Sequence, residues 1–203
     1  MAKILSIDFD YFIDASNLER EIYFPRGGDE IPSEQLKTIW QMKHAQYSQL
    51  PKIGVIEQFY TMKNYLRLLE IKKDNFYNSD SHKNIKKLID TIPKSSQLSI
   101  VNVDFHHDYY HYYSGGQYLN CGNWLRRVVE ERPNTLVKWI RREDSQIYSL
   151  EGEFPFQHTT DLTSVLSEGY DYIFICRSPE WSPPHLGKRY DELVRAALDS
   201  QIA

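Results

Sequence analysis

The sequence has little cysteine, little net charge and no long apolar run. Two cysteines among 203 residues, Cys121 and Cys176, cannot form a disulfide scaffold, so we expect a reducing compartment such as the cytoplasm. The formal net charge of −4 gives no electrostatic reason to expect a nucleic-acid partner. No apolar run approaches the ~20 residues that a membrane span needs, so no membrane partner is expected. The opening MAKILSIDFD contains two carboxylates, which argues against a signal peptide.

The composition is that of an ordinary soluble globular protein. Hydrophobic residues make up 41% of the chain and charged residues 26%. The length suits one domain with a core buried on both faces of a sheet, and no linker-like segment interrupts it. We therefore predict a single domain over residues 1–203.

Short apolar runs alternate with segments of helical periodicity. The runs predict strands at 3–9, 98–103, 135–140 and 171–176. Helices are expected at 33–47, 55–71, 82–91, 120–131 and 160–168, and from Pro184 to about residue 200. Segments 13–32 and 109–120 are expected to be loops, and 141–158 is expected to be a polar excursion. This alternation predicts an α/β fold with three layers, a mostly parallel sheet with helices on both faces.

Two carboxylates lie at the end of the first predicted strand. Asp8 and Asp10 flank Phe9, and in extended backbone the residues at i and i+2 point to the same side. A D-x-D pair of this kind is often a solvated strand edge or a helix cap. Two carboxylates held close together are unfavourable unless a cation or a shared proton relieves their repulsion.

A second polar cluster follows the next predicted strand. Asp104, His106 and Asp108 recur at the same two-residue interval. In open α/β folds ligands bind outside the carboxyl ends of the strands, so both clusters are expected at one edge of the sheet. Carboxylates with imidazole suit Mn²⁺, and less often Fe²⁺ or Zn²⁺. Two such ions roughly 3.5–4 Å apart would offset this concentration of negative charge.

These motifs resemble those of the ureohydrolases, the arginases and agmatinases of the arginase/deacetylase fold. Ser6-Ile7-Asp8-Phe9-Asp10 is similar to their S-x-D-x-D motif, and Asp104 to Asp108 is similar to their D-x-H-x-D motif. The segments SIDFDYF, VNVDFHHD, CGNW and ICRSPEW more closely resemble small arginase-like proteins that include peptide arginases. The resemblance implies a dinuclear manganese site that converts arginine within a peptide to ornithine and urea.

The resemblance also implies roles for individual residues. Asp8 and Asp104 would bridge the two ions, Asp10 and His106 would complete one ion, and Asp108 would help hold the other. A hydroxide bridging the ions would attack the guanidinium carbon. His111, in the Tyr/Gly loop, is the candidate proton shuttle and is grouped with Asp108 as catalytic. His107 is expected to point away from the metals.

The substrate guanidinium needs a carboxylate, because a carboxylate matches its planar fork. Glu180, just past the last predicted strand, is the first candidate, with Ser178 beside it and Ser114 in a polar loop. The alternative readings are a surface acid for Glu180 and a flexible turn for Ser114. The expected partner is an arginine-containing precursor peptide, and the oligomeric state is not predicted. The chain is shorter than classical arginases, so an open site with the Tyr-rich loop 109–118 along its approach would suit a peptide.

The chain departs from the ureohydrolase pattern in two ways. Its D-x-D strand precedes its D-x-H-x-D strand, a rearranged order that a parallel sheet tolerates because ligands come from strand ends. Ureohydrolases also use a histidine upstream of D-x-H-x-D. Alignment places Gln58 near that position, and His44 and Glu30 are the other candidates for a sixth ligand.

Three other functions remain open from the sequence. A metal-dependent deacetylase or other amidohydrolase of the same fold would use the same ions on an acyl amide. A non-catalytic module could bind a basic peptide at a degenerate metal site. A magnesium phosphotransferase or phosphatase could use D-x-D at a strand end, but it would leave D-x-H-x-D unexplained.

Overall fold

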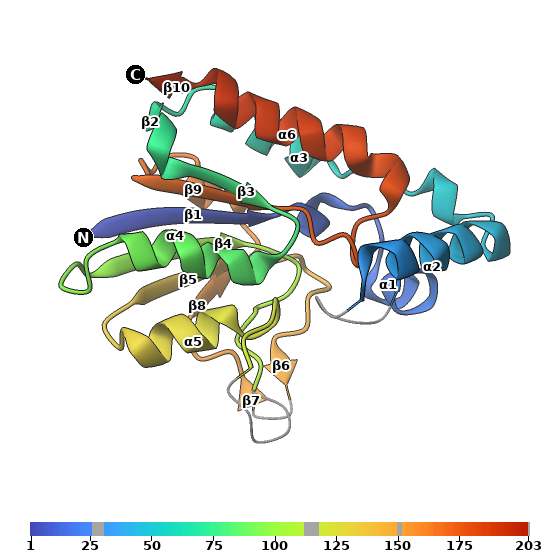
Figure 1. The fold of residues 1–203 in the computed structure, drawn as a ribbon, viewed down its shortest axis with the longest axis horizontal. Coiled ribbons are helices and arrows are strands. Elements are labelled where there is room, and N and C mark those ends of the chain that lie inside the picture. Colours follow the sequence, from blue (N-terminus) through green and yellow to red (C-terminus); the bar gives the residue numbers. More distant parts are fainter. Residues whose placement is uncertain (26–30, 112–117, 150–151, 203) are drawn as a thin grey trace.

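A six-stranded parallel sheet lies at the centre of the protein (Figure 1). The structure is a computed structural model, and it describes residues 1–25, 31–111, 118–149 and 152–202. The strand order is β3-β9-β1-β4-β5-β8, and every neighbouring pair is parallel. The strands are β1 (Ala2–Asp8), β3 (Phe76–Ser79), β4 (Leu98–Val103), β5 (Leu136–Ile140), β8 (Gln157–Thr159) and β9 (Tyr172–Cys176).

Helices cover both faces of this sheet, which makes three layers (Figure 1). One face carries α3 (Glu57–Leu66) and α6 (Gly187–Asp199), and the other carries α4 (Ile85–Thr91) and α5 (Trp124–Glu131). Helices α1 (Asn17–Tyr23) and α2 (Ser33–Gln46) lie beyond the carboxyl end of β1. Two small pairs complete the described fold: β2 (Ile71–Lys72) with β10 (Gln201–Ile202), and β6 (Tyr148–Ser149) with β7 (Gly152–Glu153).

The core is divided between the two faces of β1. Leu5 and Ile7 are fully buried in the cluster that includes the apolar residues of α3 and α6. Ile4 is fully buried in the opposite cluster, with Trp124 of α5 and Leu88 of α4. A strand covered on both faces needs apolar residues at successive positions, which explains the continuous run that predicted it.

The α/β prediction is confirmed, with all four expected strands present. The expected loop at 13–32 contains α1, β3 lies in a polar segment for which no strand was predicted, and β8 begins at the end of the polar excursion 141–158. The expected helix at 55–71 ends at Leu66, and the one at 160–168 is a short 3₁₀ helix, Leu162–Val165. Among the helices described, none has both the length and the apolar character needed to cross a membrane.

Candidate metal centre

The register of the sheet brings the two acidic motifs together. Ile7 of β1 pairs with Val103 of β4, and Asp8 pairs with Cys176 of β9. The carboxyl ends of these three strands are therefore level. Asp104 follows β4 directly and so lies beside Asp8, as expected from the position of both motifs at strand ends.

Asp10 reaches the centre through a tight turn rather than through extended backbone. The strand ends at Asp8, whose side chain caps the 3₁₀ helix Phe9–Phe12 by accepting a hydrogen bond from the Asp10 N–H at 3.1 Å. The D-x-H-x-D motif is not extended either, because β4 ends at Val103 and Asp108 has a φ of 53°. The expected i, i+2 geometry is thus corrected, although the carboxylates still converge.

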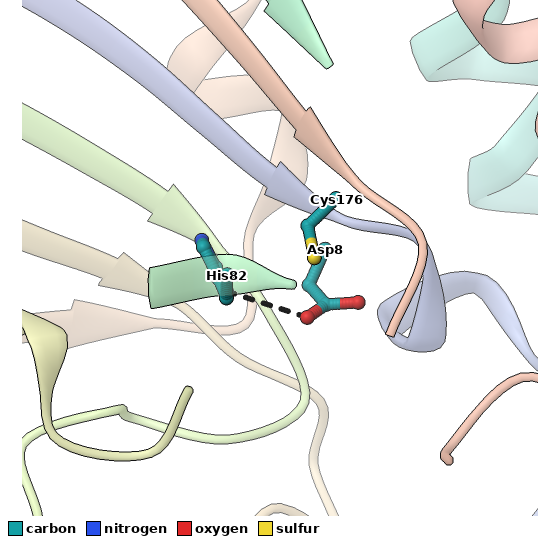
Figure 2. A group of neighbouring side chains, drawn as sticks. All are labelled: Asp8, His82 and Cys176. Carbon is teal, nitrogen blue, oxygen red and sulfur yellow. Dashed lines mark ion pairs between the residues drawn. The ribbon is translucent and has the colours of Figure 1, made fainter. Parts of the chain in front are cut away.

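His82, which the sequence analysis did not identify, lies at the middle of the carboxylates. Its Nδ1 is 3.3 Å from Asp8 Oδ2, 3.2 Å from Asp104 Oδ2 and 2.9 Å from Asp108 Oδ2. Its Nε2 is 2.7 Å from Ser6 Oγ, which fixes the orientation of the ring. Figure 2 shows the imidazole pointing toward the Asp8 carboxylate, with the Cys176 thiol beside the Asp8 side chain.

The position of His82 explains why sequence reasoning missed it. It comes three residues after β3, a half-exposed polar strand inside a Lys-rich stretch, and it begins the turn that leads into α4. The ring is fully buried, stacked on Phe174 and tilted against Trp124. The available signal was a histidine shortly after a strand end, but β3 had no apolar run to reveal that strand.

Two of the three residues predicted as sixth ligand, Gln58 and His44, do not belong to the described carboxylate–imidazole groups. Gln58 lines a separate polar cavity with Arg141 and Arg142. His44 packs against His185, with ring centroids 5.4 Å apart. Glu30 lies outside the described residues. Among the described residues, His82 rather than Gln58 or His44 belongs to the groups that could hold a metal ion.

A second carboxylate–imidazole group adjoins the first. His106 Nδ1 lies 3.0 Å from Asp10 Oδ2, and Asp10 Oδ1 accepts a hydrogen bond of 3.4 Å from the Phe105 N–H. Asp10, Asp104 and His106 can offer ligand atoms to one ion, and so can His82, Asp104 and Asp108. Asp104 is common to both groups.

Neighbouring donors hold the carboxylates in place. Ser178 Oγ donates to Asp8 Oδ2 at 2.5 Å, and Trp124 Nε1 donates to Asp108 Oδ2 at 2.5 Å. Asn102 Nδ2 donates to Asp104 Oδ2 at 3.2 Å. Hydrogen bonds of this kind orient ligand groups around a metal and limit their rotation.

Burial makes this concentration of charge costly without a cation. Burial and the nearby carboxylates raise the pKa of Asp8 to about 7 and the pKa of Asp104 to about 8. Burial alone would lower the pKa of His106, but the Asp10 carboxylate 3.0 Å away and the surrounding negative charge raise that pKa to about 9. The centre therefore retains protons at neutral pH unless another cation replaces them.

The donor set fits a divalent metal ion. Two buried atoms of the described centre, His82 Nδ1 and Asp10 Oδ2, have no hydrogen-bond partner. Both lie about 3 Å from other ligand atoms, the spacing expected between adjacent ligands of an octahedral ion with bonds of about 2.1 Å. The buried Asp and His groups are thus compatible with divalent metal binding.

A cavity of about 330 Å³ opens onto these carboxylates. Its lining includes His111, the predicted shuttle, and Ser178, and its walls include the aromatic rings of Tyr110 and Trp181. Glu180 is buried but does not belong to this lining, and Ser114 lies outside the described residues.

His107 is kept away from the metal ligands, as the sequence suggested. Its ring packs against Tyr110 and Phe154, and its Nδ1 accepts a hydrogen bond from the Tyr109 N–H. Burial, aided by the charges of His106 and Arg126, lowers the pKa of His107 to about 4. It is a neutral packing residue at neutral pH.

No known protein family matches the chain, and no curated protein or solved structure is significantly similar to it. Fold and site together define an α/β protein with a buried carboxylate–imidazole centre suited to a divalent cation. A more particular function has to be argued from the chemistry of the centre and from the two motifs.

Proposed function

We propose that this protein is a manganese-dependent hydrolase that converts peptidyl arginine to ornithine with release of urea. The observation that carries the proposal is the sharing of Asp104 between two carboxylate–imidazole groups. A shared carboxylate between two cation positions is what a two-ion hydrolytic site requires. Both motifs are also similar to those of the ureohydrolases.

The ligands divide between two cation positions. His82, Asp104 and Asp108 would hold one ion, and Asp10, Asp104 and His106 would hold the other. Asp8 lies beside His82 at 3.3 Å and is fixed by Ser178, so it would serve as the second carboxylate shared by the two ions. Oxygen-rich ligands with one imidazole for each ion favour Mn²⁺ over softer metals. When bound, the ions supply Lewis acidity and lower the pKa of water.

The cavity residues suit a guanidinium substrate. The rings of Tyr110 and Trp181 line the cavity, and aromatic faces attract planar cations. His111 lies on the same lining and is placed to deliver the proton that the leaving amine needs. Hydrolysis adds one water to the side chain, breaks the bond between the guanidinium carbon and Nε, and leaves an ornithine amine and urea.

The experiment is a mass spectrum of an arginine-containing peptide after incubation with the protein and Mn²⁺. We expect a loss of ~42 Da per modified arginine, the mass change of guanidino hydrolysis. An Asp8→Ala variant should show no loss, whereas Asp199→Ala, an exposed acid at the end of α6, should react normally. An unchanged arginine peptide, or a deacylated amine formed without urea, would contradict the proposal and favour a binding module or an amidohydrolase.

A further inference from the structure

A buried arginine lies beside the centre and takes no part in either acidic motif. Arg20 belongs to α1, and its side chain is only 1% exposed. Its Nε donates to the carbonyl of Ala15 at 3.2 Å, and its Nη2 donates to the carbonyls of Asp10 at 2.7 Å and Ile13 at 3.2 Å. These three backbone contacts fix the guanidinium in one orientation.

The charge of Arg20 is directed at one metal ligand in particular. Its Nη1 has no hydrogen-bond partner in the described structure and lies 3.8 Å from Asp10 Oδ2. Its Cζ lies 3.8 Å from the centroid of the ring of Phe105, the residue after Asp104. Burial lowers the pKa of Arg20 to about 10, which leaves it charged at neutral pH.

Among the described residues, no salt bridge joins an arginine or lysine to the ligands of the other cation position. His82, Asp104 and Asp108 pack against aromatic rings and hydroxyl or amide groups. The largest electrostatic influences on Asp104 and Asp108 come from carboxylates and the two histidines, without an arginine or lysine. Within the described residues, the fixed positive charge of Arg20 therefore lies against Asp10 at 3.8 Å, and only a smaller part of its influence reaches Asp8.

We propose that Arg20 makes the two cation positions unequal, so that the position formed by Asp10, Asp104 and His106 binds its ion more weakly and fills second. This inference rests on the proposed two-ion function. A guanidinium that already neutralises part of the Asp10 charge also repels a divalent ion nearby. At the effective dielectric of a protein interior, such a repulsion weakens binding on the order of tenfold or more.

The first test assigns the two binding steps. Metal-free protein is titrated with Mn²⁺, and free Mn²⁺ is followed by its paramagnetic resonance signal. We expect two steps with dissociation constants at least about tenfold apart. His106→Ala should lose the weaker step and keep the tighter one, whereas His82→Ala should lose the tighter step. The opposite assignment, or two equal steps in the unaltered protein, would overturn the inference and leave the two-ion function standing.

The second test separates the charge of Arg20 from its structural contacts. Arg20→Met removes the charge, and we expect the weaker step to tighten by about tenfold. Arg20→Lys keeps the charge and should retain the weaker step within about threefold. A purely structural role would weaken manganese binding in both variants and would contradict the inference. If Arg20→Met does not fold, the His106→Ala and His82→Ala variants still decide which cation position binds its ion more weakly. If the unaltered protein binds no second ion at all, that result contradicts the proposed function itself.

Discussion

Ser178 donates a hydrogen bond from its hydroxyl to Asp8, and its backbone has a positive φ. Its φ of 47° lies in the left-handed region, which costs a non-glycine residue of order 1–3 kcal/mol. From there the hydroxyl donates to Asp8 Oδ2 at 2.5 Å and lies 3.3 Å from Cys176 Sγ. Unfavourable backbone at such a position is retained because it aims a side chain at the site.

Ser178→Ala should weaken manganese binding or turnover by about 10- to 100-fold, the usual effect of losing a residue that orients a metal ligand. Ser178→Gly removes the same hydroxyl but tolerates the positive φ, so it should melt at a higher temperature than the alanine variant. A manganese titration and thermal unfolding measure the two effects. An alanine variant that binds and turns over normally would show that the hydroxyl has no orienting role.

Helix α1 is the element that places Arg20 against the centre. It begins at a capping box, in which the Ser16 hydroxyl accepts from the Glu19 N–H and the Glu19 carboxylate accepts from the Ser16 N–H. The helix has seven residues, too few for an isolated helix to be stable in water. Its contacts with the rest of the chain therefore matter, among them this cap, the buried Arg20, and the hydrogen bond from the Asn17 N–H to Asp144 Oδ2.

Ser16→Ala should destabilise the protein by about 0.5–2 kcal/mol, because it removes the side-chain acceptor of the Glu19 N–H. For a chain of this length, each kcal/mol corresponds to a fall of about 2–4 °C in Tm. Ser16→Asp preserves an acceptor at the cap and should retain the Tm of the unaltered protein. Thermal unfolding compares the two variants, and an alanine variant with unchanged Tm would mean that the capping box does not contribute.

Stability of the whole molecule should depend on pH through its metal centre. Asp8 and Asp104 have folded pKa values of about 7 and 8, well above the 3.8 of a free carboxyl. Their contribution is fully present below pH 3.8 and is lost as pH rises through 7 to 8, since the unfolded chain releases these protons earlier. The raised pKa values of His82 and His106 act in the same direction above pH 6.5.

We therefore expect the Tm of the metal-free protein to fall as the pH rises from 5 to 9. Excess Mn²⁺ should restore most of this loss of Tm. The metal replaces the lost protons, and a ligand at about 100 times its Kd stabilises by about 2.7 kcal/mol. Thermal unfolding with and without Mn²⁺ across this pH range measures the effect. In the control variant Asp104→Asn, the Tm of the metal-free protein should depend less on pH. A manganese-induced rise in Tm that is larger at pH 5 than at pH 8 would be inconsistent with this linkage.

The sequence by itself determined the features that depend on residues close together in the chain, namely the buried strands and the two acidic motifs. The apolar runs of β1, β4, β5 and β9 reveal buried strands because a strand covered on both faces needs such a run. The two acidic motifs reveal five residues of the centre because each motif directly follows one of those strands. Strands β3 and β8 escaped prediction because they are short, polar and at the edges of the sheet.

Tertiary structure alone decided which distant residues complete the centre. His82 meets Ser6 across 76 positions of the chain, and Ser178 meets Asp8 across 170. Arg20 is close in sequence to Asp10, but only the turn after β1 and the packing of α1 direct its charge toward that carboxylate. Such pairings follow from the order and register of the strands, and no local pattern of residues encodes them.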